Sequence, residues 1–170
     1  MVNFLVCPSV EVIIILLFFF FFYQVIPYTV TLFTGDLAKA GTDSNVTIKA
    51  FGSNGASREI TIDKMKDRFE RGAIDSLRVE LEDIGSLKKV RVSHDAKGSR
   101  KDWFLERVEM TNLTTQKHYI FDCKEWLSKN KDHSKGLSID VPVQKGGKVS
   151  INQTSYKISG KAITKLCFFL

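Results

Sequence analysis

The chain has 170 residues, 44% of them hydrophobic and 26% charged, a length that allows one domain with a buried core. Its formal net charge is +6. This excess does not indicate a nucleic-acid partner, because residues 28–143 hold 20 Lys and Arg against 18 Asp and Glu, whereas residues 144–170 hold five lysines and no acid.

The first 25 residues are an apolar N-terminal segment, with an unbroken hydrophobic run from Val12 to Tyr23. The run is shorter than the roughly 20 apolar residues that a transmembrane helix needs. It also lacks the basic front and the small-residue cleavage site of a secretory signal. Two interpretations stay open: a membrane-associating segment, or an intron read as protein, since five consecutive Phe codons form a pyrimidine-rich tract. The codons of Lys148-Val149-Ser150 can spell an exon end followed by an intron start, so residues 149–170 share the intron interpretation. We expect the basic tail, residues 144–170, to be poorly ordered.

Residues 26–143 alternate apolar and polar side chains with the period of two that is typical of β-strands. We expect eight short strands, in the segments 28–32, 46–50, 60–62, 77–81, 87–92, 104–110, 119–121 and 137–143. Their regular spacing predicts an all-β antiparallel sandwich of two four-stranded sheets. A short helix or turn is expected at 124–129, with Trp126 and Leu127 packed inward.

The sequence offers no constellation for catalysis. Its three histidines, His94, His118 and His133, are not spaced as a metal-binding pair, and there is no Gly-x-Ser-x-Gly, Gly-rich phosphate loop or Cys-x-x-Cys. We therefore predict that the protein is not an enzyme and takes no small-molecule substrate. Cys123 is the one cysteine between residues 28 and 143, which favours a reducing, cytoplasmic compartment.

Several separated motifs occur in one order between residues 28 and 143. They are Thr34-Gly35-Asp36, Ala40-Gly41-Thr42-Asp43, Phe69-Glu70-Arg71-Gly72, Asp83-Ile84-Gly85, His94-Asp95 and Trp103-Phe104-Leu105. With these motifs the segment resembles a PLAT domain, the lipoxygenase-homology sandwich. It is most similar to the tandem lipoxygenase-homology-domain repeat proteins of hair-cell stereocilia, which are thought to link plasma membrane and cytoskeleton. The chain is too short to be a lipoxygenase.

The resemblance implies a Ca²⁺ cofactor, because PLAT domains often bind calcium through loops at one end of the sandwich. Calcium takes six to eight oxygen ligands. The candidates for these ligands are Gly41, Asp43, Asn45, Asp67, Glu70, Asp83 and Asp95. Lys39 and Arg68 stand where related domains often carry acids, and such cations raise the cost of placing a divalent ion nearby, so we expect modest affinity. The alternative is that these acids only stabilise turns.

Apolar side chains beside turns, together with one basic loop, are the candidate membrane contacts. The candidates are Phe51, Met65 and Phe69, with Lys97, Arg100 and Lys101 from the basic loop. A cation near an anionic leaflet contributes about 1 kcal/mol. Trp103 and Trp126 are assigned to the core instead, since both have apolar neighbours.

Together these observations predict a non-catalytic, calcium-modulated module that docks on an anionic membrane surface, on protein partners or on both. Its expected place is the cytoplasmic side of the plasma membrane, in a cell projection if the repeat-protein resemblance holds. One alternative is the regulatory PLAT domain of a lipoxygenase or lipase whose catalytic part lies elsewhere. Another is a calcium-independent protein-binding module.

Overall fold

The computed structural model describes residues 11–13, 25–62, 68–131 and 134–144. The predictions for most of the apolar N-terminal segment, for the basic tail and for the candidate site residues Met65 and Asp67 lie outside the described residues. Within the described segments, no helix is long and apolar enough to cross a membrane.

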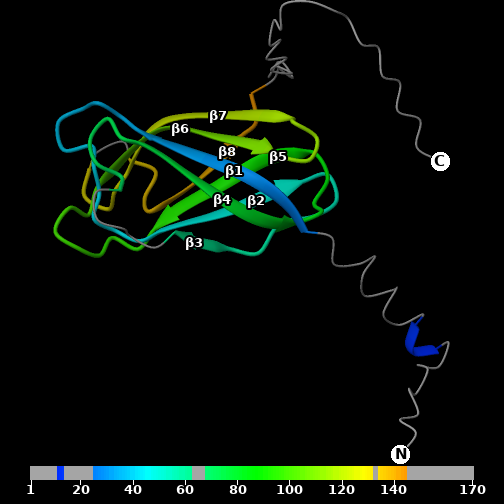
Figure 1. The fold of residues 1–170 in the computed structure, drawn as a ribbon. Coiled ribbons are helices and arrows are strands. Elements are labelled where there is room, and N and C mark those ends of the chain that lie inside the picture. Colours follow the sequence, from blue (N-terminus) through cyan, green and yellow to red (C-terminus); the bar gives the residue numbers. More distant parts are fainter. Residues whose placement is uncertain (1–10, 14–24, 63–67, 132–133, 145–170) are drawn as a thin grey trace, which may run out of the picture.

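Eight antiparallel strands form two sheets that pack face to face (Figure 1). The strands are β1 (Val25–Thr34), β2 (Val46–Gly52), β3 (Ile60–Ile62), β4 (Ile74–Glu82), β5 (Leu87–His94), β6 (Trp103–Asn112), β7 (His118–Leu127) and β8 (Ser138–Pro142). One sheet has the strand order β4-β1-β6-β7 and the other β3-β2-β5-β8. The predicted sandwich of two four-stranded sheets is confirmed.

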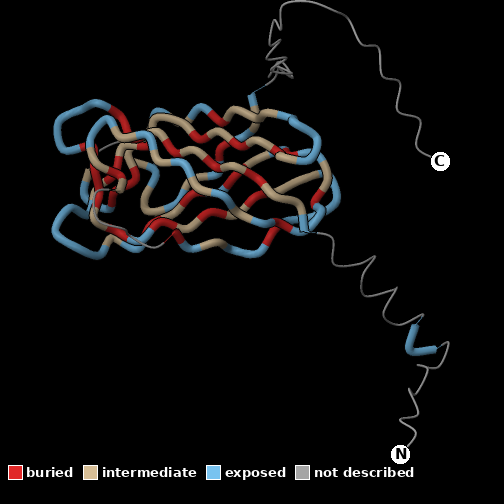
Figure 2. The backbone as a smooth tube through the Cα atoms, viewed as in Figure 1, coloured by how far each residue is buried: buried red, intermediate tan, exposed pale blue. Residues whose placement is uncertain are grey.

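The hydrophobic core lies between the sheets and follows from the period-two pattern. In β1, Tyr28, Val30 and Leu32 are buried and alternate with less buried residues. The same alternation runs through the middle of both sheets in Figure 2. Fully burying one large aliphatic or aromatic side chain stabilises the fold by about 1.5–3 kcal/mol. This shared interior fixes which side of each strand faces outward.

Strands β6 and β7 depart from simple alternation. In β6 the buried positions change from Leu105 to Val108, and the register with both neighbouring strands shifts there. The expected helix at 124–129 is wrong, because β7 continues to Leu127 past an irregularity at Lys124, whose φ is 54°. Leu127 is buried as predicted, but Trp126 is only half-buried and packs edge-to-face against the Phe104 ring. An extra residue of this kind re-aims the side chains that follow it.

The sandwich has two ends with different connections. What we call the loop end carries the β1–β2 loop (35–45), the β3–β4 loop (described at 68–73), the β5–β6 loop (95–102) and the β7–β8 loop (described at 128–131 and 134–137). The turn end carries the connections 53–59, 83–86 and 113–117. In Figure 1 the loop end is on the left and the turn end on the right. Most candidate site residues fall at the loop end.

Candidate functional site

Backbone hydrogen bonds hold the β1–β2 loop between its two neighbours. The N–H of Thr42 donates to the carbonyl of Phe69 (3.0 Å), and the N–H of Asp43 donates to the carbonyl of Arg100 (2.9 Å). A Cβ on Gly41 would lie 2.9 Å from the Phe69 carbonyl oxygen, so glycine is required for this close approach. Backbone contacts alone therefore hold the β1–β2, β3–β4 and β5–β6 loops side by side, without an ion or a partner.

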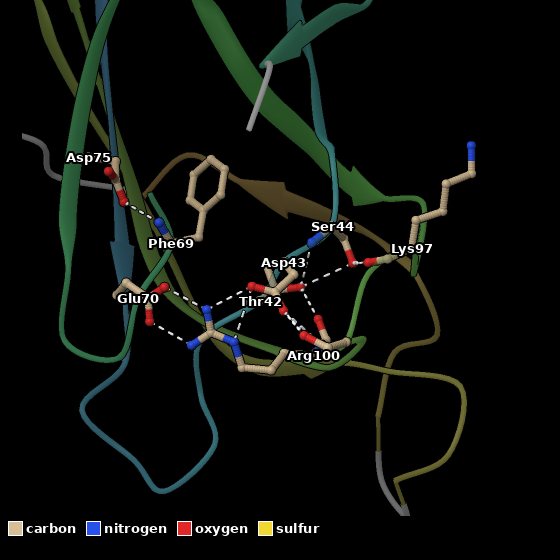
Figure 3. A network of polar contacts seen from close by, with 9 residues as sticks. Thr42, Asp43, Ser44, Phe69, Glu70, Asp75, Lys97 and Arg100 are labelled. Atoms are coloured by element: carbon tan, nitrogen blue, oxygen red, sulfur yellow. Dashed lines mark hydrogen bonds and ion pairs between the residues drawn. The ribbon is translucent and has the colours of Figure 1, made fainter. Parts of the chain in front are cut away.

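Arg100 joins two of the predicted calcium ligands at this junction (Figure 3). Its Nη1 and Nη2 donate to the two carboxylate oxygens of Glu70, both at 2.5 Å. Its Nη2 and Nε donate to Oδ1 of Asp43, at 2.7 and 3.2 Å. We call this set of contacts the Arg100 bridge. The bridge gives Arg100, predicted as a membrane contact, two carboxylate partners within the protein.

The second oxygen of Asp43 is also engaged. Oδ2 accepts hydrogen bonds from the backbone N–H of Arg100 (3.0 Å) and from the hydroxyl of Ser99. The Asp43 side chain is 10% exposed, whereas those of Glu70 and Arg100 are both 43% exposed. The hydrogen bonds that Arg100 donates to Glu70, and then those to Asp43, raise its pKa above the ordinary value. The guanidinium is therefore permanently charged.

Asp95 and Asn45 form a separate pair beside the bridge. The carboxylate of Asp95 accepts hydrogen bonds from the backbone N–H and the side-chain Nδ2 of Asn45, at 3.1 and 2.8 Å. It also accepts the N–H of Lys97 (3.1 Å), and the Lys97 ammonium lies 3.8 Å away. Burial is the largest single effect and raises the pKa of Asp95, but the hydrogen bonds from Lys97 and Asn45 and the Lys97 charge together lower it below its ordinary value. Asp95 therefore has the partners of a turn residue, the alternative considered from sequence.

Two buried hydroxyls that sequence reasoning missed complete the loop junction. Thr42 Oγ1 donates to the carbonyl of Arg100 (2.9 Å), and Ser44 Oγ donates to the carbonyl of Lys97 (2.9 Å). Both residues have 0% exposure. A serine or threonine beside an acidic motif is too common in surface turns to have been singled out by the sequence alone.

Phe69 is a correction to the predicted membrane contacts. The residue is completely buried, because its backbone has a φ of 56° and its N–H donates to Asp75 Oδ2 (2.9 Å). Its ring lies 5.3 Å from the ring of Trp103, whose Nε1 donates to Thr34 Oγ1 (3.0 Å). Phe69 and Trp103 thus form the apolar floor beneath the loops, and the assignment of Trp103 to the core is confirmed.

Two further candidates lie away from the loop end. Asp83 is in the β4–β5 turn at the turn end, where its Oδ1 accepts the N–H of Gly85 (3.0 Å). It cannot share an ion with Asp43. Phe51 is on the outer face of β2, where the ammonium of Lys89 lies 4.4 Å from its ring centroid. Phe51 therefore does not lie in a loop tip beside Lys97 and Lys101.

The loop end also carries exposed apolar and basic side chains. Leu37 is 45% exposed and Ile74 is 65% exposed. Lys39, Lys101 and Lys129 are exposed, and none of the three makes an ion pair with another residue in the described ranges. The Lys131 ammonium packs on the Trp126 ring. Burial lowers its pKa, the charge of Asp102 opposes this shift, and the charge of Lys39 adds to it. Leu37 escaped the sequence analysis because a lone leucine in a loop has no periodicity.

The described residues of the loop end do not fit a calcium ion as they stand. Glu70 and Asp43 already accept hydrogen bonds from Arg100, and Asp95 accepts them from Asn45 and Lys97. Within residues 25–62, 68–131 and 134–144, no group of three or more His, Cys, Asp or Glu side chains is placed to hold a metal. A positive charge at the centre of the carboxylates also opposes a divalent ion.

The sandwich and its loop-end motifs define the class of lipoxygenase-homology domains. The sequence profile of the PLAT/LH2 domain matches residues 28–140, so the chain belongs to the PLAT family. The family predicted from the sequence is therefore confirmed.

Among its relatives is lipoxygenase homology domain-containing protein 1. The Mus musculus protein is 38% identical over 134 residues, which cover 79% of this chain and 6% of that protein. The Homo sapiens protein is 41% identical over 104 residues, which cover 61% of this chain and 5% of that protein. The chain thus spans a small fraction of the length of the relatives it matches.

A similar solved structure is that of coral 8R-lipoxygenase, described as showing calcium activation via a C2-like domain. The two structures align with a TM-score of 0.61 and 27% identity, over 70% of this chain and 17% of the coral enzyme. A calcium-regulated protein therefore shares the fold, whereas the described loop end of this chain holds Arg100 between its carboxylates.

Proposed function

We propose that this PLAT domain is a non-catalytic docking module whose loop end binds an anionic membrane surface. The observation that carries the proposal is that the acidic side chains at this end have partners within the protein, whereas several basic side chains do not form ion pairs in the described ranges. The carboxylates of Asp36, Asp43, Glu70 and Asp95 all accept hydrogen bonds from groups of the protein, whereas Lys39, Lys101 and Lys129 form no ion pair within the described residues. The surface therefore presents cations outward.

The arrangement matches the chemistry of a lipid headgroup layer. Each lysine near an anionic leaflet contributes about 1 kcal/mol, and this attraction falls off within a Debye length of about 8–10 Å. Leu37 and Ile74 add exposed apolar side chains at the same end, which can enter the boundary between headgroups and acyl chains. Lys97, 79% exposed, adds a further cation although Asp95 lies beside it.

We place this function in a larger protein, because the chain matches only about a twentieth of its relatives' length. We further propose that this larger protein has several domains and docks at the cytoplasmic face of the plasma membrane, with protein partners on surfaces other than the loop end. A role in a membrane–cytoskeleton linker of cell projections, and the alternative of a regulatory domain in a lipoxygenase or lipase, are extensions of the same proposal. In each case the domain itself performs no chemistry.

Co-sedimentation of the full chain with vesicles tests the docking surface. The vesicles contain phosphatidylserine and phosphatidylcholine, or phosphatidylcholine alone, and the test variant is Lys101→Glu with Lys129→Glu. The matched control is Lys88→Glu with Lys117→Glu, which makes the same charge change at exposed residues near the turn end. Using the full chain in every arm keeps any contribution of the apolar N-terminal segment constant.

We expect the loop-end variant to lose at least tenfold in affinity for phosphatidylserine vesicles, because two attractive charges become repulsive. The control variant should lose much less. Equal losses in both variants would mean that only net charge matters, and they would overturn the assignment to the loop end. Binding that neither variant weakens would overturn electrostatic docking altogether.

A further inference from the structure

The Arg100 bridge connects three separate loops through one positive charge (Figure 3). Asp43 comes from the β1–β2 loop, Glu70 from the β3–β4 loop and Arg100 from the β5–β6 loop. Glu70 is held by two parallel hydrogen bonds of 2.5 Å, and Asp43 by a third of 2.7 Å from the same guanidinium. Drawing carboxylates of different loops together is the mechanical effect that a bound divalent cation has in loops of this kind.

The bridge differs from a bound ion in being permanent. The guanidinium keeps its charge at every pH at which the protein is folded, and it cannot dissociate from the chain. Bidentate pairing of arginine with a carboxylate is among the strong charge-assisted hydrogen bonds. A calcium ion entering between Asp43 and Glu70 would meet the Arg100 charge, and it would have to break the hydrogen bonds that both carboxylates already accept.

We propose that Arg100 takes the place of a calcium ion in this PLAT domain, so that the loop end keeps its docking shape without metal. The inference rests on the proposed function, because it concerns how the same docking surface is held ready. The guanidinium supplies one positive charge to two carboxylates, which keeps the loops joined and leaves Lys39, Lys101 and Lys129 as the groups that attract lipid. Calcium then has no part in switching the surface on.

A thermal unfolding experiment on the full chain tests this substitution. Wild type, Arg100→Gln and Arg71→Gln are unfolded in EGTA, in millimolar CaCl₂, and in MgCl₂ of equal ionic strength. Arg71 is the matched control, because it also joins the β3–β4 loop to the β1–β2 loop but reaches a single carboxylate, Asp36, at 2.6 Å. Glutamine removes the charge in both variants and keeps a polar side chain of moderate length.

The expected result is a Tm of the wild type that calcium does not change. Arg100→Gln should have a lower Tm in EGTA and recover several degrees in calcium but not in magnesium, because Asp43 and Glu70 then lose the guanidinium that joins them. Arg71→Gln should show no calcium-specific response. If Arg100→Gln is unfolded in EGTA, calcium is expected to restore its cooperative transition.

Either of two results would overturn the inference. One is a calcium-specific rise in the Tm of the wild type, and the other is an Arg100→Gln variant that calcium neither stabilises nor refolds. Vesicle binding by the wild type, measured in EGTA and in calcium, should be the same. A protein that binds no vesicles but shows the predicted Tm pattern would refute the docking proposal alone, so the two failures are distinguishable.

Discussion

The loop end and the turn end of the sandwich are closed by different chemistry. At the loop end, charged pairs connect the loops, such as Arg71 with Asp36 (2.6 Å) and Arg100 with Glu70. At the turn end, Asn112 Nδ2 donates to the Tyr28 hydroxyl (3.1 Å), and Asn112 Oδ1 accepts the N–H groups of Thr114 and Thr115. Buried neutral side chains thus connect the segments of the turn end, whereas ion pairs with exposed members add to the backbone contacts between the loops of the loop end.

The difference indicates which end can respond to its surroundings. Ion pairs at the surface weaken with salt and change when another charge approaches. Hydrogen bonds between buried neutral groups are insensitive to salt and to an approaching charge. Leaving one of these buried groups without its partner costs folding free energy. We therefore expect the turn end to resist a change of conditions, whereas the electrostatics of the loop end depend on salt, on anionic lipid and on the one guanidinium that organises it.

The largest effect should come from the floor beneath the loops. Trp103→Ala removes a fully buried indole and leaves Thr34 Oγ1 without its donor, so a loss of about 3–5 kcal/mol is expected. Trp126→Ala, which truncates the half-buried outer indole, should cost about 1 kcal/mol. Urea unfolding of both variants gives the comparison. Equal losses would mean that Trp126 belongs to the core.

At the turn end, Asn112→Ala should cost roughly 2 kcal/mol, because the buried amide serves the Tyr28 hydroxyl and two backbone N–H groups at once. Asn112→Asp, which keeps the acceptor oxygen for the turn, should recover part of this loss. The same urea titration, repeated at high salt, should give an unchanged difference from wild type. A salt-sensitive difference would contradict the neutral character assigned to this end.

His94 makes the loop end sensitive to mild acid. Burial lowers its pKa, partly offset by the Leu127 carbonyl (3.1 Å) and by the charges of Asp95 and Asp102. The unfolded chain therefore takes up this proton first, so the contribution of His94 to stability is complete above its ordinary pKa of about 6.5 and declines as pH falls below it. His94→Gln should reduce the pH dependence of the free energy of unfolding between pH 7 and 5. The change in free energy should be smaller than the loss expected for Asn112→Ala. An unchanged pH slope in that variant would assign the sensitivity elsewhere.

The smallest effect is expected on the outer face between the two ends. Hydrogen bonds from Arg91 and then Lys89 hold the pKa of Asp140 well below its ordinary value. The stability that the ionised Asp140 carboxylate contributes is fully present above the ordinary carboxyl pKa of about 4, and it is lost as pH falls toward the lowered pKa. Because the group is partly exposed, Asp140→Asn should cost less than about 1 kcal/mol at pH 7. The difference from wild type should shrink in acid; a constant difference down to pH 2 would contradict the ion pair.

Much of the fold followed from local pattern. Leu77, Val79 and Leu81 alternate with charged residues, and such a pattern has one reasonable interpretation, a strand with one wet face. The pattern failed in β6 and β7, where extra residues shift the register. A bulge depends on pairing between strands, which no periodicity within one strand reports. For this reason the sequence pattern did not predict that Trp126 lies on the outer face.

The candidate site was only half predictable. Asp43 and Glu70 were identified because acids in these motifs are typical of the family. Arg100 was not identified as their partner, because it lies 57 residues from Asp43 and 30 residues from Glu70 in the sequence. A basic loop is also usually solvated surface. Phe69 was misplaced because its left-handed backbone turns the ring inward, a conformation that residue type alone does not disclose.

The path of the chain through the sandwich has a consequence for neighbouring domains. Strand β1 begins at the turn end, and β8 runs toward it, so that Val143 donates its N–H to the Lys88 carbonyl (2.8 Å). Any domain joined before β1 or after β8 is tethered in that half of the molecule. In an array of such domains the connections would therefore lie at the end opposite the loops, so several loop ends could reach one surface and add their weak affinities.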